Sequence, residues 1–194
     1  MTVLDLIRHG EPVGGRRYRG HLDDPLSEKG WRQMREAVGE HCPWDAIVSS
    51  PLRRCAAFAE ELATRHGLPL VLEPRFKEVG FGAWEGRTRE ELETDSPGCL
   101  RHFYSDPINH TPPGAEPLVD FRQRVLAGLD DLLARHDGRH VLLVGHAGLI
   151  RVIIGHALAI PLAHIFRINV DNACLTRLRV DAGQPALMFH AGRL

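Results

Sequence analysis

The sequence predicts an α/β fold, a three-layer sandwich in which a mostly parallel central sheet carries helices on both faces. Short apolar runs of strand length alternate with segments whose apolar residues recur at helical spacing. Two of the strand-like runs end abruptly in turns that pair glycine with histidine, as expected at a ligand-binding sheet edge. The 194 residues, 43% hydrophobic and 25% charged, suffice for one core without disulfides or metal. We therefore expect a single domain over residues 1–194.

The first seventy residues contain strands and helices in alternation. Apolar runs predict strands at residues 2–7, 46–48 and 70–72. Ser27 is suited to cap a helix that continues to Val38 with one apolar face. A second helix, rich in Ala, Glu and Leu, is expected from Leu52 to His66 and should end at Gly67.

Residues 74–117 form the least regular part of the chain. They contain six prolines and five glycines, and only one short helix is expected in them, near 88–93. A long irregular segment within one domain is usually functional, so we expect this one to cover the active site.

The remainder of the chain returns to regular structure. Apolar residues at helical spacing from Leu118 to Leu133 predict an amphipathic helix. A strand is expected at 141–144, followed by an apolar helix to about Ala159. Two further strands are expected at 175–180 and 186–189.

Charge and composition exclude several classes of function. The chain has 24 Lys and Arg against 25 Asp and Glu, so its formal net charge of −1 is unlike that of a nucleic-acid binder. The most apolar stretch, 141–160, is interrupted by Arg151 and two histidines, so no membrane span is expected. No signal peptide is visible, and the four cysteines are widely spaced, which favours a cytoplasmic protein. The sequence leaves the oligomeric state open.

Three of the expected strands end in residues suited to anion binding. Arg8 and His9 follow the first strand, the segment 49–54 follows the second, and His146 follows the strand at 141–144. Because parallel strands point the same way, these ends should meet at one edge of the sheet. Arginine forks and imidazoles without an acidic cluster indicate a dianionic substrate group rather than a metal.

Four short motifs then appear in a fixed order. They are LIRHGE at 6–11, SPLRR at 50–54, EVGFGAWEG at 78–86 and GHAG at 145–148. Together they span nearly the whole chain and resemble the signature segments of the histidine phosphatase superfamily, whose members have the phosphoglycerate mutase-like fold. The resemblance implies a phosphatase that forms a phosphohistidine intermediate.

The resemblance also implies roles for individual residues. His9 would be the nucleophile that accepts the phosphoryl group, and Arg8, Arg54 and His146 would surround its oxygens. Glu78 would protonate the leaving oxygen and then activate the hydrolytic water. Glu85 is the rival acid, but the family pattern favours a turn carboxylate that accepts backbone N–H bonds. No cofactor or metal is expected.

The loop after His9 departs from the family pattern. Many members carry a hydroxyl residue and a phosphate-binding Asn where this chain has Pro12 and Gly15. Arg16, Arg17 and Arg19 follow, and the sequence leaves open whether one contacts the substrate or all belong to a solvated basic loop.

The expected substrate is a small phosphomonoester. The segment 166–174 resembles that of α-ribazole-5′-phosphate phosphatases of cobalamin assembly, which favours that substrate. Alternatives are a broad-specificity sugar or nucleotide phosphatase, a protein-phosphohistidine phosphatase or a phosphoglycerate mutase, although the span from Trp84 to Leu118 is short for a mutase's protective loops. A phosphate-binding module without catalysis is the alternative from another class.

Overall fold

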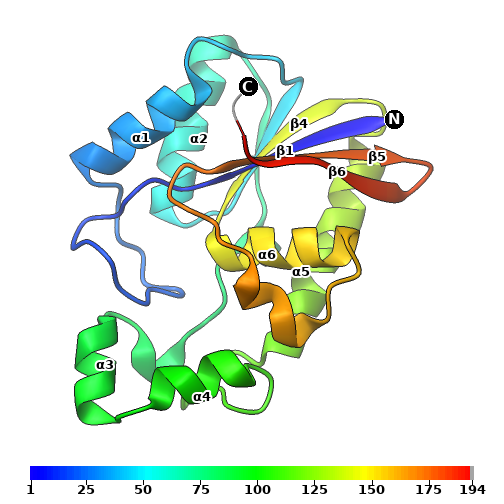
Figure 1. The fold of residues 1–194 in the computed structure, drawn as a ribbon. Helices are drawn as coiled ribbons and strands as arrows, with labels where there is room; N and C mark the ends of the chain where they lie inside the picture. Colours follow the sequence, from blue (N-terminus) through cyan, green and yellow to red (C-terminus); the bar gives the residue numbers. More distant parts are fainter. Residues whose placement is uncertain (193–194) are drawn as a thin grey trace.

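The computed structural model of the protein describes residues 1–192 and contains a six-stranded sheet in the order β3-β2-β4-β1-β5-β6 (Figure 1). The strands are β1 (Thr2–Arg8), β2 (Ala46–Ser49), β3 (Leu70–Leu72), β4 (His140–Gly145), β5 (Leu175–Asp181) and β6 (Gln184–Gly192). β1 to β4 run parallel, and β5 and β6 join antiparallel at one side. The predicted mostly parallel sheet is confirmed.

Helices cover both faces of this sheet. The α-helices are α1 (Glu28–Val38), α2 (Arg53–His66), α3 (Arg89–Asp95), α4 (Cys99–Ser105), α5 (Leu118–Arg135) and α6 (Ala147–Ala157). Three short 3-10 helices are η1 (Pro74–Phe76), η2 (Gly82–Trp84) and η3 (Leu162–Arg167). Each predicted strand and long helix is present, with ends within a few residues of the expected ones.

The two faces of β4 show how the sandwich is built. Val141 and Leu143 pack with residues of α5 and α6, whereas Leu142 and Val144 pack with residues of α1 and α2. Successive side chains of a strand point to opposite faces, so a continuous apolar run buries both faces of a central strand. The three-layer architecture is thereby confirmed.

A close approach of two glycines positions the loop after β1. A Cβ atom on Gly10 would lie 2.2 Å from the carbonyl oxygen of Gly30 in α1, and one on Gly30 would lie 2.1 Å from that of Glu11. Ser27 caps α1 as predicted, because its Oγ accepts a hydrogen bond from Gly30 N. The loop that carries His9 is therefore held against the start of α1.

The segment between β3 and α5 contains more helix than the sequence predicts. Only a helix near 88–93 was expected, but the segment holds both α3 and α4, which lie apart from the sheet (Figure 1). The expectation of one helix was wrong because α4, with seven residues, is too short for a periodic signal and lacks a capping box like that of Thr88 and Glu91 at α3. Its Leu100 and Phe103 instead pack on Trp84 and Leu92. We call residues 77–117, with this apolar cluster, the cap.

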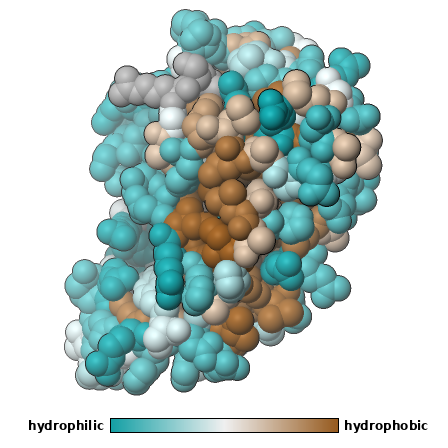
Figure 2. Space-filling model, turned by 45° about the vertical axis from the view of Figure 1, so that its right-hand side comes forward, coloured by the Kyte–Doolittle hydropathy of each residue, from teal (hydrophilic) through white to brown (hydrophobic). Residues whose placement is uncertain are grey.

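The surface is mostly polar, with one apolar band. Figure 2 shows this band crossing the middle of one face between hydrophilic areas. Large apolar side chains that are about half exposed include Leu158 and Met188. Within residues 1–192, no helix has the length and apolar character to cross a bilayer.

Candidate active site

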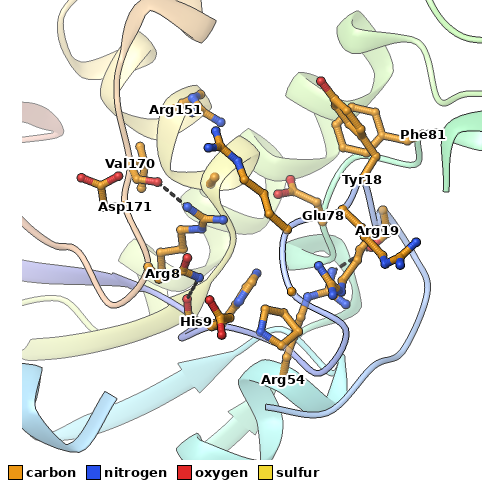
Figure 3. A pocket seen from close by; sticks show the side chains of 18 of the residues that line it. Arg8, His9, Tyr18, Arg19, Arg54, Glu78, Phe81, Arg151, Val170 and Asp171 are labelled. Atoms are coloured by element: carbon orange, nitrogen blue, oxygen red, sulfur yellow. Dashed lines mark hydrogen bonds between the residues drawn. The ribbon is translucent and has the colours of Figure 1, made fainter. Parts of the chain in front are cut away.

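A cavity of about 460 Å³ opens where β1, β2 and β4 end (Figure 3). Its walls come from the loop after β1, the first turns of α2 and α6, the cap, and the loop that precedes β5. This volume is typical of a small-molecule site, and the place is where parallel sheets bind ligands. The structure thus brings the predicted strand ends together at one edge.

His9 lies at the base of the cavity with one ring nitrogen anchored. Its Nδ1 is 2.7 Å from the carbonyl oxygen of Gly10, and a carbonyl only accepts, so Nδ1 carries the proton. Nε2 therefore holds a lone pair, and it has no hydrogen-bond partner within residues 1–192. Burial and the charges of Arg8 and Arg54 hold the pKa of His9 well below 6.5. The ring is a neutral imidazole suited to nucleophilic attack.

Arg8 and Arg54 supply positive charge to the cavity wall. Arg8 donates from Nη1 to the carbonyl oxygen of Val170 at 2.6 Å, and its buried Nε has no partner among the described residues. Arg54 is 1% exposed and donates to the carbonyl oxygens of Gly20 and Leu22, at 2.8 and 2.6 Å. Its neighbour Arg53 does not line the cavity. The arginine of this pair that lines the cavity is therefore Arg54, the one that the resemblance to the family implies.

His146 lies beside His9 but outside the cavity wall. The centroids of the two rings are 5.2 Å apart, and His146 is fully buried. Its Nε2 is 2.8 Å from Oγ of Ser50, and burial together with the charge of Arg54 holds its pKa well below 6.5. The contact of His146 with phosphoryl oxygens stays a prediction, and the ring lies next to the nucleophile that would carry them.

The two acidic candidates occupy different environments. Glu78 lines the cavity, and its carboxylate accepts hydrogen bonds from Val79 N at 3.0 Å and Gly148 N at 3.2 Å. Glu85 instead accepts from the backbone N–H groups of His21 and Phe81 through one oxygen. Glu85 is thus the turn carboxylate that was expected.

The cavity is strongly cationic although the chain is nearly neutral. Its walls contain three acidic side chains, those of Glu11, Glu78 and Asp171, and a larger set of arginines. The seven arginines are Arg8, Arg16, Arg17, Arg19, Arg54, Arg89 and Arg151. An excess of fixed positive charge in a concave site attracts anionic ligands.

The loop after His9 contributes three of these arginines. Arg17 donates to the carbonyl oxygens of Gly14 and Gly86, and Arg19 donates to Val13 O and pairs with Asp24 at 2.9 Å. Arg16 makes no such bond with any residue that the structure describes. All three arginines line the cavity.

Several wall residues were not singled out from the sequence. Arg151, Tyr104 and Arg89 line the cavity from α6 and the cap, where no local pattern distinguishes them from surface residues. Phe166 and residues 169–172 also line it, and they fall within the segment that suggested a substrate. Within 1–192, no group of three or more His, Cys, Asp or Glu residues is placed to hold a metal ion.

Comparison with known proteins agrees with this geometry. Residues 4–191 match the sequence profile of the histidine phosphatase superfamily (branch 1). The chain belongs to the histidine phosphatase superfamily. The family predicted from the four motifs is confirmed, as is the fold. YhfR from Bacillus stearothermophilus superposes with a TM-score of 0.88 at 30% identity, covering 97% of this chain and 96% of YhfR. A mycobacterial glucosyl-3-phosphoglycerate phosphatase superposes with a TM-score of 0.85 at 31% identity, covering 96% and 97%.

Curated relatives within the superfamily differ in length and in name. The chain is 36% identical over 180 residues to the bifunctional protein Rv2228c of Mycobacterium tuberculosis, covering 90% of this chain but only about half (49%) of that relative. It is 32% identical to phosphoserine phosphatase 1 of Hydrogenobacter thermophilus, covering 93% of this chain and 88% of that protein. The adenosylcobalamin/α-ribazole phosphatase of Salmonella typhimurium is 29% identical, with 93% and 91% covered.

Proposed function

We propose that the protein hydrolyses a small-molecule phosphomonoester through a phosphohistidine at His9. The observation that supports this most directly is the anchored ring of His9, whose Nδ1–H is bound to Gly10 O and whose Nε2 lone pair is free at the base of an arginine-lined cavity. Phosphoryl transfer depends mainly on positioning and on positive charge around the transferred group. This site supplies both.

The reaction has two steps, and each uses groups of the wall. Nε2 of His9 attacks phosphorus, the P–O bond to the leaving group breaks, and Glu78 gives its proton to the departing oxygen. Glu78, now a carboxylate, takes a proton from a water that attacks the phosphohistidine, and the P–N bond breaks to release phosphate. Arg8 and Arg54 stabilise negative charge on the phosphoryl oxygens in both steps.

The test is phosphate release from p-nitrophenyl phosphate by wild type and by His9→Ala, in EDTA. We expect wild-type activity to persist in the chelator and the variant to lose about 10³-fold or more in kcat/KM. A matched control is His156→Ala, which removes an exposed histidine of α6 and should retain activity. Protein incubated with ³²P-labelled substrate and denatured in alkali, where phosphohistidine persists, should carry label only when His9 is present. Equal, negligible release by wild type and His9→Ala would favour a phosphate-binding module instead.

The substrate candidate from the sequence is α-ribazole 5′-phosphate. The Salmonella relative named for it supports this candidate, at 29% identity over 185 residues. Relatives named for phosphoserine and for glucosyl-3-phosphoglycerate are comparably similar, at 32% and 33%. A kcat/KM for α-ribazole 5′-phosphate at least ~100-fold above other esters, about 2.7 kcal/mol of preference, would support a role in cobalamin synthesis. Steady formation of 2-phosphoglycerate from 3-phosphoglycerate would instead indicate a mutase.

A further inference from the structure

Arg151 is a cation of the cavity wall that the reaction at His9 does not use. It projects from α6, is partly buried, and makes no ion pair with any residue from 1 to 192. Burial lowers the pKa of this guanidinium, and the negative charge of Glu78 offsets part of that shift. A buried charge without an ion-pair partner is costly. Such a cation is expected where a ligand supplies the missing negative charge.

The guanidinium of Arg151 is held in a fixed orientation. Its Nε donates to the carbonyl oxygen of Ile168 at 2.9 Å, and its charged end lies over the ring of Phe166, 5.6 Å from the centroid. Both terminal amino groups are left without a hydrogen-bond partner among the described residues. Two parallel N–H donors in a fixed plane match the geometry of a carboxylate or phosphate.

The position of Arg151 relates it to the leaving group. Gly148, whose N–H binds the carboxylate of Glu78, is three residues before Arg151 on α6, and Ala147 on the same face also lines the cavity. Residues three or four apart share a helix face at a rise of about 5 Å. In Figure 3 the side chain of Arg8 lies between His9 and Arg151. An ester whose leaving oxygen meets Glu78 would therefore extend toward Arg151.

Further arginines lie around this end of the cavity. Burial lowers the pKa of Arg8 to about 10, and the positive charges of Arg151 and Arg16 contribute to that shift, opposed by Glu78 and Asp171. Arg16 and Arg89 are exposed at the wall and form no ion pair with a described residue. With Arg54, these five arginines exceed the two carboxylates Glu78 and Asp171 by three charges, so a phosphoryl dianion leaves one positive charge unbalanced.

We infer that the leaving group of the substrate carries a second anionic group, a carboxylate or a second phosphate, which binds the free fork of Arg151. This inference rests on the proposed function and specifies the substrate class of the same site. It predicts a higher kcat/KM for acidic phosphomonoesters than for α-ribazole 5′-phosphate, because the leaving group of α-ribazole 5′-phosphate is an uncharged nucleoside.

The test compares esters that differ in one group. 3-Phosphoglycerate and glycerol 1-phosphate differ only in a carboxylate against a hydroxymethyl group. We expect wild type to favour 3-phosphoglycerate by about tenfold or more in kcat/KM, because hydrogen bonds to charged groups are the stronger kind. Arg151→Met should lower this ratio toward one, Arg151→Lys should restore part of it, and Arg101→Gln, an exposed arginine of α4, should leave it as in wild type. Fructose 1,6-bisphosphate against fructose 6-phosphate tests a second phosphate in the same way.

A binding measurement separates this inference from the proposed function. Calorimetry with His9→Ala compares the Kd values of the two three-carbon esters without turnover. Tighter binding of 3-phosphoglycerate that is lost on adding Arg151→Met supports the inference, even if no ester is hydrolysed and the proposed function fails. Equal Kd values, a preference insensitive to Arg151→Met, or a kcat/KM for α-ribazole 5′-phosphate above that of every acidic ester would overturn it.

Discussion

Two buried histidines lie side by side at the base of the site, and both are held neutral. His9 and His146 have pKa values well below 6.5 because each is buried and lies near Arg54. In the unfolded chain the same side chains would titrate near 6.5. Between the folded and unfolded pKa values the unfolded state binds more protons, so stability is lost as pH falls below about 6.5.

This linkage makes the unfolding free energy depend measurably on pH. Each histidine should contribute up to about 1.4 kcal/mol of unfolding free energy per pH unit below pH 6.5, so His146→Gln should give a shallower slope than wild type. Denaturant unfolding from pH 7 to pH 5 measures it, with the exposed His41→Gln as control. Identical slopes for wild type and His146→Gln would mean that the folded protein protonates this ring readily.

Individual residues differ in how far the sequence predicted them. Arg8, His9 and Arg54 occur in motifs that end strands or begin a helix, so their convergence followed from the parallel sheet. Glu78 lies in the irregular segment, and only the resemblance to the family predicted it. Arg151 has no local signal, because its importance comes from the absence of a partner in the folded chain. The enclosed position of His146 depends likewise on Ser50, which is 96 residues away.

At the scale of elements, α6 places its first turn directly against Glu78. A Cβ atom on Gly148 would lie 2.3 Å from Oε1 of Glu78, so only glycine permits this contact without displacement. We expect Gly148→Ala to displace the carboxylate and lower kcat/KM by about 10²-fold, since small misplacements of catalytic groups cost this much. Steady-state kinetics beside thermal unfolding would separate this effect from a loss of folding.

Gly155→Ala is the matched control for that variant. It adds the same methyl group to the same helix, at a position where the nearest atom is Cγ2 of Ile165 at 3.0 Å. Its effect should appear in Tm and not in kcat/KM. A Gly148→Ala enzyme with wild-type kcat/KM would argue against Glu78 as the proton donor.

The elements also show where sequence patterns stop being informative. The helix from Leu118 was predictable because six of its buried residues recur at helical spacing over five turns. The seven-residue α4 is preceded by its N-cap Gly98, whose φ is +82°, and Glu93 accepts hydrogen bonds from the N–H groups of Gly98 and Leu100. Its position depends on contacts within the cap rather than on its own periodicity.

At the scale of the whole molecule, one buried carboxylate links several strands away from the cavity. Asp5 of β1 is fully buried and accepts from Nε1 of Trp44 at 2.8 Å and from both Nε and Nη2 of Arg177 on β5. His140, at the start of β4, lies 2.9 Å from the same carboxylate. Each of these polar groups depends on Asp5 for its partner.

Removing this carboxylate should therefore destabilise the sheet without altering the chemistry. We expect Asp5→Ala to lower the unfolding free energy by about 3 kcal/mol, because it leaves partly buried charged and polar groups unpaired. Denaturant unfolding measures the loss, and kcat/KM per folded molecule should stay close to wild type. Asp181→Ala, at the exposed end of β5, is the control. A loss below about 1 kcal/mol would show that water replaces Asp5 as the partner.

The cap has an apolar cluster of its own, made by Trp84, Leu92, Leu100 and Phe103, apart from the two clusters that face the sheet. Yet α3 and α4 of the cap supply Arg89 and Tyr104 to the cavity wall, while His9, its arginines and Glu78 come from outside these two helices. Mutations can thus accumulate in α3 and α4 during evolution with little penalty to the folding of the sheet. A lineage with this arrangement can change the compound it consumes while its reaction chemistry is inherited intact. Relatives named for phosphoserine, α-ribazole and glucosyl-3-phosphoglycerate, each about 30% identical to this chain, are the pattern that such divergence produces.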